Sequence, residues 1–188
     1  MLRSRLPSGS PKVCDVNNNA LAGNSDQYKS GCDTGGKAFL CADYSPIPVD
    51  DNLAYGFAVR KGNTNCCKCF ELKWTSGAAK GKKMVVQVHN LVDTTSGPGA
   101  TDSDWILAIP GGGSGVNQLG CRAQYGTTWG EASGGVVSRE DCESLPQNLQ
   151  GGCYFRFNWA LGDINGWKVT SKQVTCPSQL TDISGCSA

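Results

Sequence analysis

Short segments in which apolar and polar residues alternate run through most of the chain and predict β-strands. In one of them, Phe70, Leu72 and Trp74 fall on one face, whereas the charged residues between them fall on the other. Segments of this kind, rich in Val, Phe, Tyr and Trp and bounded by Gly, Asn or Pro, are residues 53–59, 69–75, 82–90, 105–109, 153–159 and 168–176. We therefore expect strands that each have one solvent face and one core face.

The segment 153–159 fits this pattern because Phe155, Phe157 and Trp159 alternate with Tyr, Arg and Asn. Its composition predicts a strand with an aromatic core face.

Helical signals are few. The Ser-Arg-Glu-Asp sequence at 138–141 predicts a capped turn running to Leu145, and Pro177 predicts the start of a last helix that Gly185 ends. Short strands with minor helices predict an all-β fold that closes, or nearly closes, into a β-barrel.

The length of 188 residues and the hydrophobic content of 39% are those of one globular domain with a core. Residues 1–13, rich in Ser, Pro and Arg, are expected to form a flexible tail, and residues 14–188 a single domain. The first residues contain no apolar signal core, and no stretch of the chain is apolar enough to span a membrane.

Eleven cysteines, spread from Cys14 to Cys186, indicate an oxidising compartment in which disulfides support a loop-rich fold. A secreted, extracellular protein is therefore expected. We expect either that a signal peptide has been removed or that the true N-terminus lies upstream of Met1. The cysteine count is odd, so at least one thiol lacks a partner within this chain.

Charge argues against several partners. The net charge is +1, with 17 basic and 16 acidic residues interspersed, so the field that holds nucleic acid or an anionic membrane is absent.

Metal and cofactor sites are also disfavoured. His89 is the single histidine, and the cysteines at 66–69 lack the second cluster that a zinc site requires. The glycine run at 111–113 lacks the Lys-Ser/Thr of a phosphate loop and predicts a tight backbone crossing instead. His89 lies at a strand end, where a polar structural role is favoured over a substrate contact, and both interpretations stay open.

Three aspartates, Asp93, Asp102 and Asp104, lie in a polar loop that leads into the strand at Trp105. Glycosidic bond hydrolysis typically needs one protonated carboxyl group for the leaving oxygen and one carboxylate that activates water or attacks directly. Loops between strands are where active sites are commonly built. The alternative is that these carboxylates are solvated surface groups.

Several motifs resemble glycoside hydrolase family 45. The blocks that carry the resemblance are residues 30–32, 41–43, 53–58, 66–72, 81–88, 109–113, 152–157 and 173–177, of which Ile109-Pro110-Gly111-Gly112-Gly113 is the most distinctive. The resemblance implies a six-stranded double-psi β-barrel with long disulfide-linked loops, and a secreted, monomeric endo-β-1,4-glucanase that inverts at the anomeric carbon. It implies a β-1,4-glucan such as cellulose as the substrate and no cofactor.

The resemblance also implies the positions of the catalytic carboxyl groups, and the chain departs from the family there. The family's general base lies in an N-terminal Tyr-Trp-Asp-Cys-Cys stretch that has no counterpart in residues 1–13. Alignment on the Pro-Gly-Gly-Gly motif places Ile106 at the general acid, so Asp104, two residues earlier, is the candidate replacement. Asp93 is the nearest counterpart of a charge-stabilising aspartate. We therefore expect the chain as given to be poorly active.

The family's cleft tyrosine is replaced by Ser133. Trp105 and Trp129 are candidates for the sugar-stacking surface, and a structural role fits either equally well.

The family pattern implies four disulfides and three unpaired thiols. The implied disulfides are Cys14–Cys41, Cys67–Cys186, Cys69–Cys176 and Cys142–Cys153, and the unpaired cysteines are Cys32, Cys66 and Cys121. Their family partners belong to the N-terminal segment that carries the general base, so the expectation is a truncated or diverged enzyme.

Two other functions stay open. An expansin-like protein would use the same barrel to bind β-glucan and loosen walls without hydrolysis. A weaker possibility is a defence or inhibitor protein of the barwin type.

Overall fold

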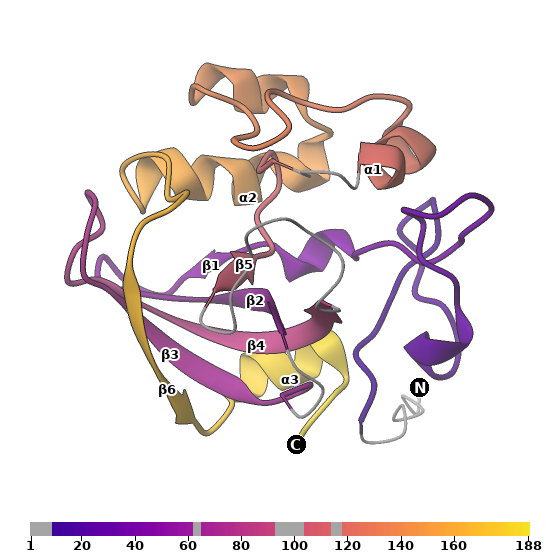
Figure 1. Ribbon diagram of the computed structural model, residues 1–188, viewed down its shortest axis with the longest axis horizontal. Helices are drawn as coiled ribbons and strands as arrows, with labels where there is room; N and C mark the ends of the chain where they lie inside the picture. The colour runs from indigo at the N-terminus through magenta and orange to yellow at the C-terminus, as the bar shows by residue number, and fades with distance from the viewer. Residues whose placement is uncertain (1–8, 62–64, 93–103, 114–117) are drawn as a thin grey trace.

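The computed structural model describes residues 9–61, 65–92, 104–113 and 118–188, and its framework is a six-stranded sheet (Figure 1). The strands are β1 (Ile47–Pro48), β2 (Leu53–Lys61), β3 (Cys69–Trp74), β4 (Lys83–Val92), β5 (Trp105–Leu107) and β6 (Val169–Val174). The order is β1-β2-β4-β3-β6, and β5 also pairs with β2. β2 runs parallel to β4, and the other pairs are antiparallel.

Five of the six predicted strands are confirmed, with ends shifted by a few residues. The pairings among the described residues do not close the sheet, so the double-psi β-barrel stays a prediction. What the structure contains is an open sheet with few helices.

Both faces of the central strands are covered. Met84, Val86 and Val88 of β4 pack in one hydrophobic cluster with β3 and the long helix α2 (Gln147–Asn158), whereas Val85 packs in a second with the last helix, α3 (Ser178–Ser184). Figure 1 shows α2 and α3 on opposite sides of the sheet. The run 84–88 is therefore buried throughout, as is typical of a strand in a parallel pair covered on both faces.

The predicted strand 153–159 is wrong, because these residues belong to α2 and the residue that follows it. Phe155 and Trp159, four residues apart, stack with ring centroids 4.9 Å apart and face the sheet, whereas Cys153 packs in a third cluster with Leu149. The helix is thus buried on more than one side. Apolar residues on several helical faces produced an alternation that resembles a strand.

The two predicted helical features are confirmed. Residues Glu140–Ser144 form a 3-10 turn, η3, and Ser138 Oγ accepts a hydrogen bond from the Asp141 amide at 3.3 Å. Pro177 precedes α3, and Gly185 ends it with φ of 72°. The remaining helical elements, which the sequence pattern did not predict, are α1 (Gln118–Tyr125), η1 (Ser25–Gln27) and η2 (Ala42–Tyr44).

Four disulfides brace the described residues. They join Cys14 to Cys41, Cys67 to Cys186, Cys69 to Cys176 and Cys142 to Cys153, which are the pairs that the resemblance implies. Cys32, Cys66 and Cys121 are free thiols. Adjacent cysteines of a strand would point to opposite faces, but Cys66 and Cys67 precede β3 in a turn, where Cys67 has φ of 66°, so strand alternation does not orient their side chains.

The N-terminal residues that the structure describes pack against the rest of the fold. The Lys12 amide donates to the Ser184 carbonyl at 2.8 Å, and the Tyr44 hydroxyl donates to the Lys12 carbonyl at 2.6 Å. Part of the expected tail, from residue 9 onward, therefore contacts the domain. Within the described residues, none of the helices has the length and apolar character to cross a membrane.

Candidate active site

Asp104 immediately precedes β5 and is exposed. In β5, Trp105 and Leu107 pack against the core and Ile106, between them, is 49% exposed. Because alternate residues of a strand face opposite sides, continued alternation places Asp104 on the exposed face of Ile106. The carboxylate predicted as the replacement acid thus lies on the exposed side of this strand, two residues before Ile106.

The edge of the sheet holds Trp105 in place. Antiparallel pairing sets Arg60 of β2 opposite Trp105. The Arg60 guanidinium lies 4.4 Å from the Trp105 ring centroid and 5.0 Å from that of Phe70, and the two rings lie 5.0 Å apart. Part of the indole surface is therefore covered by the protein. The sequence prediction missed Arg60 because its strand was expected to end at Val59.

Trp129 has structural contacts of its own. Its indole Nε1 donates to the Ser144 carbonyl at 3.2 Å, and its ring lies 5.2 Å from that of Tyr125. It packs against the cluster that contains the Cys142–Cys153 disulfide. Trp129 and Trp105 belong to different clusters, so the described contacts do not bring the two predicted sugar-stacking rings together.

His89 is the extra residue of an irregularity between β2 and β4, where the register shifts from Ala58–Val88 to Val59–Asn90. Its ring lies 5.4 Å from that of Tyr44 and 6.4 Å from that of Phe57. Nε2 is buried without a hydrogen-bond partner, and burial lowers the pKa of His89 to about 4. The imidazole is therefore neutral at neutral pH, which fits the structural interpretation.

The glycine run after β5 forms the backbone crossing that the sequence predicts. The amide of Val136 donates to the Gly111 carbonyl at 2.9 Å, and a Cβ on Gly135 would lie 1.9 Å from that oxygen. A Cβ on Gly113 would likewise lie 2.4 Å from the Ala132 carbonyl. The close approach holds the segment that contains Ser133 against the end of the β5 connection.

Asp93 and Asp102 lie outside the described residues. Among the residues that the structure does describe, no group of three or more His, Cys, Asp or Glu side chains could hold a metal ion.

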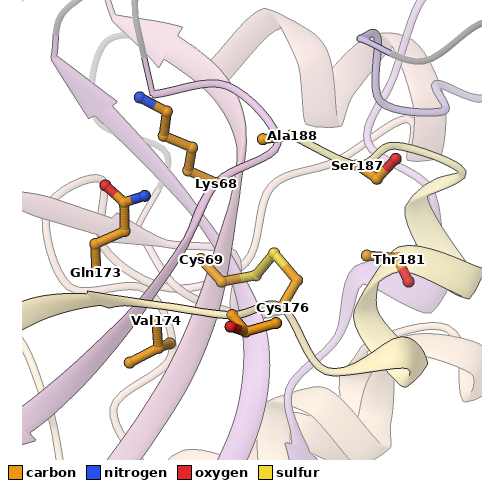
Figure 2. A pocket seen from close by; sticks show the side chains of 9 residues that line it. Lys68, Cys69, Gln173, Val174, Cys176, Thr181, Ser187 and Ala188 are labelled. Atoms are coloured by element: carbon orange, nitrogen blue, oxygen red, sulfur yellow. A yellow bond between two sulfur atoms is a disulfide. The ribbon is translucent and has the colours of Figure 1, made fainter.

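A pocket of about 680 Å³ lies elsewhere on the sheet (Figure 2). Its lining comes from the start of β3, the end of β6, helix α3 and the last two residues: Lys68, Cys69, Gln173, Val174, Thr175, Cys176, Thr181, Ser187 and Ala188. β6 and β5 pair with different strands, β3 and β2, so the pocket and Asp104 belong to different parts of the strand order. None of its lining residues is aromatic, so it offers no stacking surface for a sugar ring.

An open sheet with few helices, four disulfides and an exposed aspartate at a strand end define a disulfide-braced β-domain with a candidate acid. The chain belongs to glycosyl hydrolase family 45, whose family model matches residues 6–187.

Individual relatives agree with this assignment. The chain is 36% identical over 184 residues to an endoglucanase of Cryptopygus antarcticus, covering 93% of this chain and 76% of the relative. It is 41% identical over 180 residues to a Fusarium oxysporum protein assigned as a type K endoglucanase, of whose length it spans 46%. The crystal structure of a cellulase from the Antarctic springtail Cryptopygus antarcticus superposes with a TM-score of 0.79 at 33% identity, covering 97% of this chain and 86% of that one.

Proposed function

We propose that this chain is an endo-β-1,4-glucanase that hydrolyses internal β-1,4-glucosidic bonds of cellulose or a related β-glucan, with inversion. The observation that carries the proposal is the family match over residues 6–187, supported by the likeness to the springtail cellulase. With this function we also propose a secreted monomer and closure of the sheet into a double-psi β-barrel.

Asp104 is proposed as the general acid. Its exposed position on the Ile106 side of β5 lets a polysaccharide chain reach the carboxyl group, which would donate a proton to the glycosidic oxygen as the bond breaks. Inversion requires a second carboxylate that activates water from the opposite face of the sugar, typically about 6.5–9.5 Å from the acid. Asp93 is proposed to stabilise positive charge at the reacting carbon.

Substrate contacts are proposed for Trp105, Trp129 and His89. Trp105 has the strongest case, since it adjoins Asp104 in sequence and is only half-buried. The indole of Trp129 and the imidazole of His89 each also have contacts within the protein, to the Ser144 carbonyl and to the Tyr44 ring.

The proposal is tested by reducing-sugar release from soluble carboxymethyl cellulose and by NMR of the anomer formed first. Asp104→Asn is expected to lower kcat by about 100-fold or more, since loss of a general acid commonly costs 10²–10⁴. Asp182→Asn, an exposed aspartate on α3, is the matched control and is expected to leave the rate unchanged.

The outcomes separate the parts of the proposal. Sugar release that is the same in Asp104→Asn as in the parent would remove Asp104 from the mechanism and leave the activity standing. If the parent chain binds to cellulose but releases no reducing sugar, the proposal that it is an enzyme would be overturned and the expansin-like alternative supported.

A further inference from the structure

Helix α1 meets the N-terminal part of the chain at Cys32. A Cβ placed on Gly120 would lie 2.9 Å from Cys32 Sγ and 3.9 Å from Cys32 Cα. Because glycine has no side chain, the backbone of α1 approaches Cys32 directly at this point. A larger residue at 120 would displace the thiol.

The next residue along α1 is a second free thiol. Cys121 is half-buried, as is Cys32, and neither takes part in the four disulfides. Consecutive Cα atoms are about 3.8 Å apart, so the Cα atom of Cys121 lies about 3.8 Å from that of Gly120, the residue that approaches Cys32. Burial, with a contribution from the Cys32 charge, raises the pKa of Cys121.

We propose that Cys32 and Cys121 form a fifth disulfide in this chain, one that links α1 to the turn after Gly31. A disulfide requires Cα atoms about 4.4–6.8 Å apart and Cβ atoms about 3.5–4.5 Å apart. Cys121 follows directly after the glycine whose Cβ position meets Cys32 Sγ, and the proposal requires that rotation of the two side chains bring their sulfur atoms within bonding distance.

Glutathione disulfide is a suitable oxidant, as for other thiols in an oxidising compartment. The Cys32 thiolate attacks one glutathione sulfur, which forms a mixed disulfide and releases one glutathione. The Cys121 thiolate then attacks the Cys32 sulfur and releases the second glutathione. The two protein thiols are oxidised by two electrons, the oxidant is reduced to two thiols, and two protons are transferred.

The third free thiol provides a matched control. Cys66 is half-buried like the other two, but its sulfur lies 4.0 Å from that of Cys67, which is bonded to Cys186. It lies in the turn before β3 rather than beside α1. Burial raises the pKa of Cys66 as it does that of Cys121, so burial acts on both thiols in the same direction and the two differ in their neighbours.

The test is oxidation of the folded chain with glutathione disulfide, followed by alkylation of the remaining thiols under denaturing conditions and peptide mass spectrometry. We expect the number of alkylated cysteines to fall from three to one, with Cys66 alkylated and a linked Cys32–Cys121 peptide present. The linked form should migrate as a single chain on a non-reducing gel.

Cysteine variants identify the two residues that form the proposed disulfide. Cys32→Ser and Cys121→Ser should each abolish the linked peptide and leave two thiols, whereas Cys66→Ser should retain the linked peptide and leave none. The bridge closes a loop of about 90 residues, so oxidation should raise the Tm of the parent and of Cys66→Ser by about 5–10 °C. The Tm of the parent and of each variant is measured before and after oxidation. A folding defect caused by a substitution itself then appears as a lower Tm of the reduced variant.

Three results would overturn the proposal. These are retention of three alkylated cysteines after oxidation, glutathione adducts at Cys32 and Cys121 without a link between them, and a bridge that joins two copies of the chain.

Discussion

Arg156 and Asp163 form an ion pair in which only the arginine is buried. Arg156 Nη2 lies 3.1 Å from Asp163 Oδ1, and the two side chains are 3% and 57% exposed. Arg156 Nη1 also donates to the carbonyls of Gly111 at 3.3 Å and Val136 at 3.2 Å. The arginine thus ties α2 to the backbone crossing that follows β5.

Substitution of Arg156 should therefore lower the free energy of unfolding more than substitution of Asp163. Arg156→Ala leaves the carbonyls of Gly111 and Val136 without this donor, the latter in a buried position, and is expected to destabilise the fold by about 3 kcal/mol, a fall of roughly 6–12 °C in Tm. Asp163→Asn removes only a solvent-screened charge and should cost less than about 1 kcal/mol. Thermal unfolding of both variants checks the difference, and equal costs would contradict it.

The backbone crossing at Gly111 and Gly135 predicts that the two glycines 126 and 135 differ in the stability cost of an added side chain. Gly135 has φ of 71°, and an added Cβ would meet the Gly111 carbonyl at 1.9 Å, whereas Gly126 has φ of 75° with open space around its Cβ position. Gly126→Ala should cost about 1–2 kcal/mol from backbone strain alone. Gly135→Ala adds a backbone clash and should cost at least twice as much. Urea unfolding of the pair measures this, and similar midpoints would show that the crossing is looser than described.

His89 predicts a pH dependence of stability. Its pKa in the folded chain is about 4, against about 6.5 when unfolded. Between these values the unfolded chain binds more protons, so the free energy of unfolding falls as the pH drops from about 6.5 to 4, by up to about 3 kcal/mol. His89→Phe keeps an aromatic ring beside Tyr44 and removes the titration.

The measurement is chemical unfolding of the parent and His89→Phe at several pH values between 7.5 and 4. The difference between the two proteins should widen in favour of the variant as the pH falls through this range. A constant difference would show that the imidazole is solvated in the folded state.

Trp105 allows a substrate role to be distinguished from a structural one. If the half-buried indole stacks on a sugar, Trp105→Ala should raise KM for soluble cellulose by up to about tenfold, because stacking on an aromatic ring contributes about 0.5–1.5 kcal/mol. Trp129→Phe, which removes the hydrogen bond to Ser144 but keeps an aromatic ring, should lower stability by about 1 kcal/mol and raise KM less than Trp105→Ala does. Lower stability of Trp105→Ala with an unchanged KM would assign that ring to packing with Arg60 and Phe70.

The sequence predicts much of the candidate site, but it does not predict which side chains pack around that site. The polar loop, the strand at Trp105 and the glycine crossing are local patterns, and the resemblance supplies Ile106 as the reference position for the acid. The stacking of Arg60 on Trp105 depends on which strand pairs with β5, and that pairing joins residues that are distant in the sequence.

Local sequence patterns are enough to predict five strands, the capped turn before Leu145 and the last helix, because alternation, caps and a terminal glycine act over a few residues. The helix at residues 153–158, the bulge at His89 and the burial of Arg156 beside Gly111 are seen only in the folded chain. The physical reason is the same in each case: these features depend on burial against partners distant in the sequence, and an apolar or charged residue does not encode locally which partner will cover it.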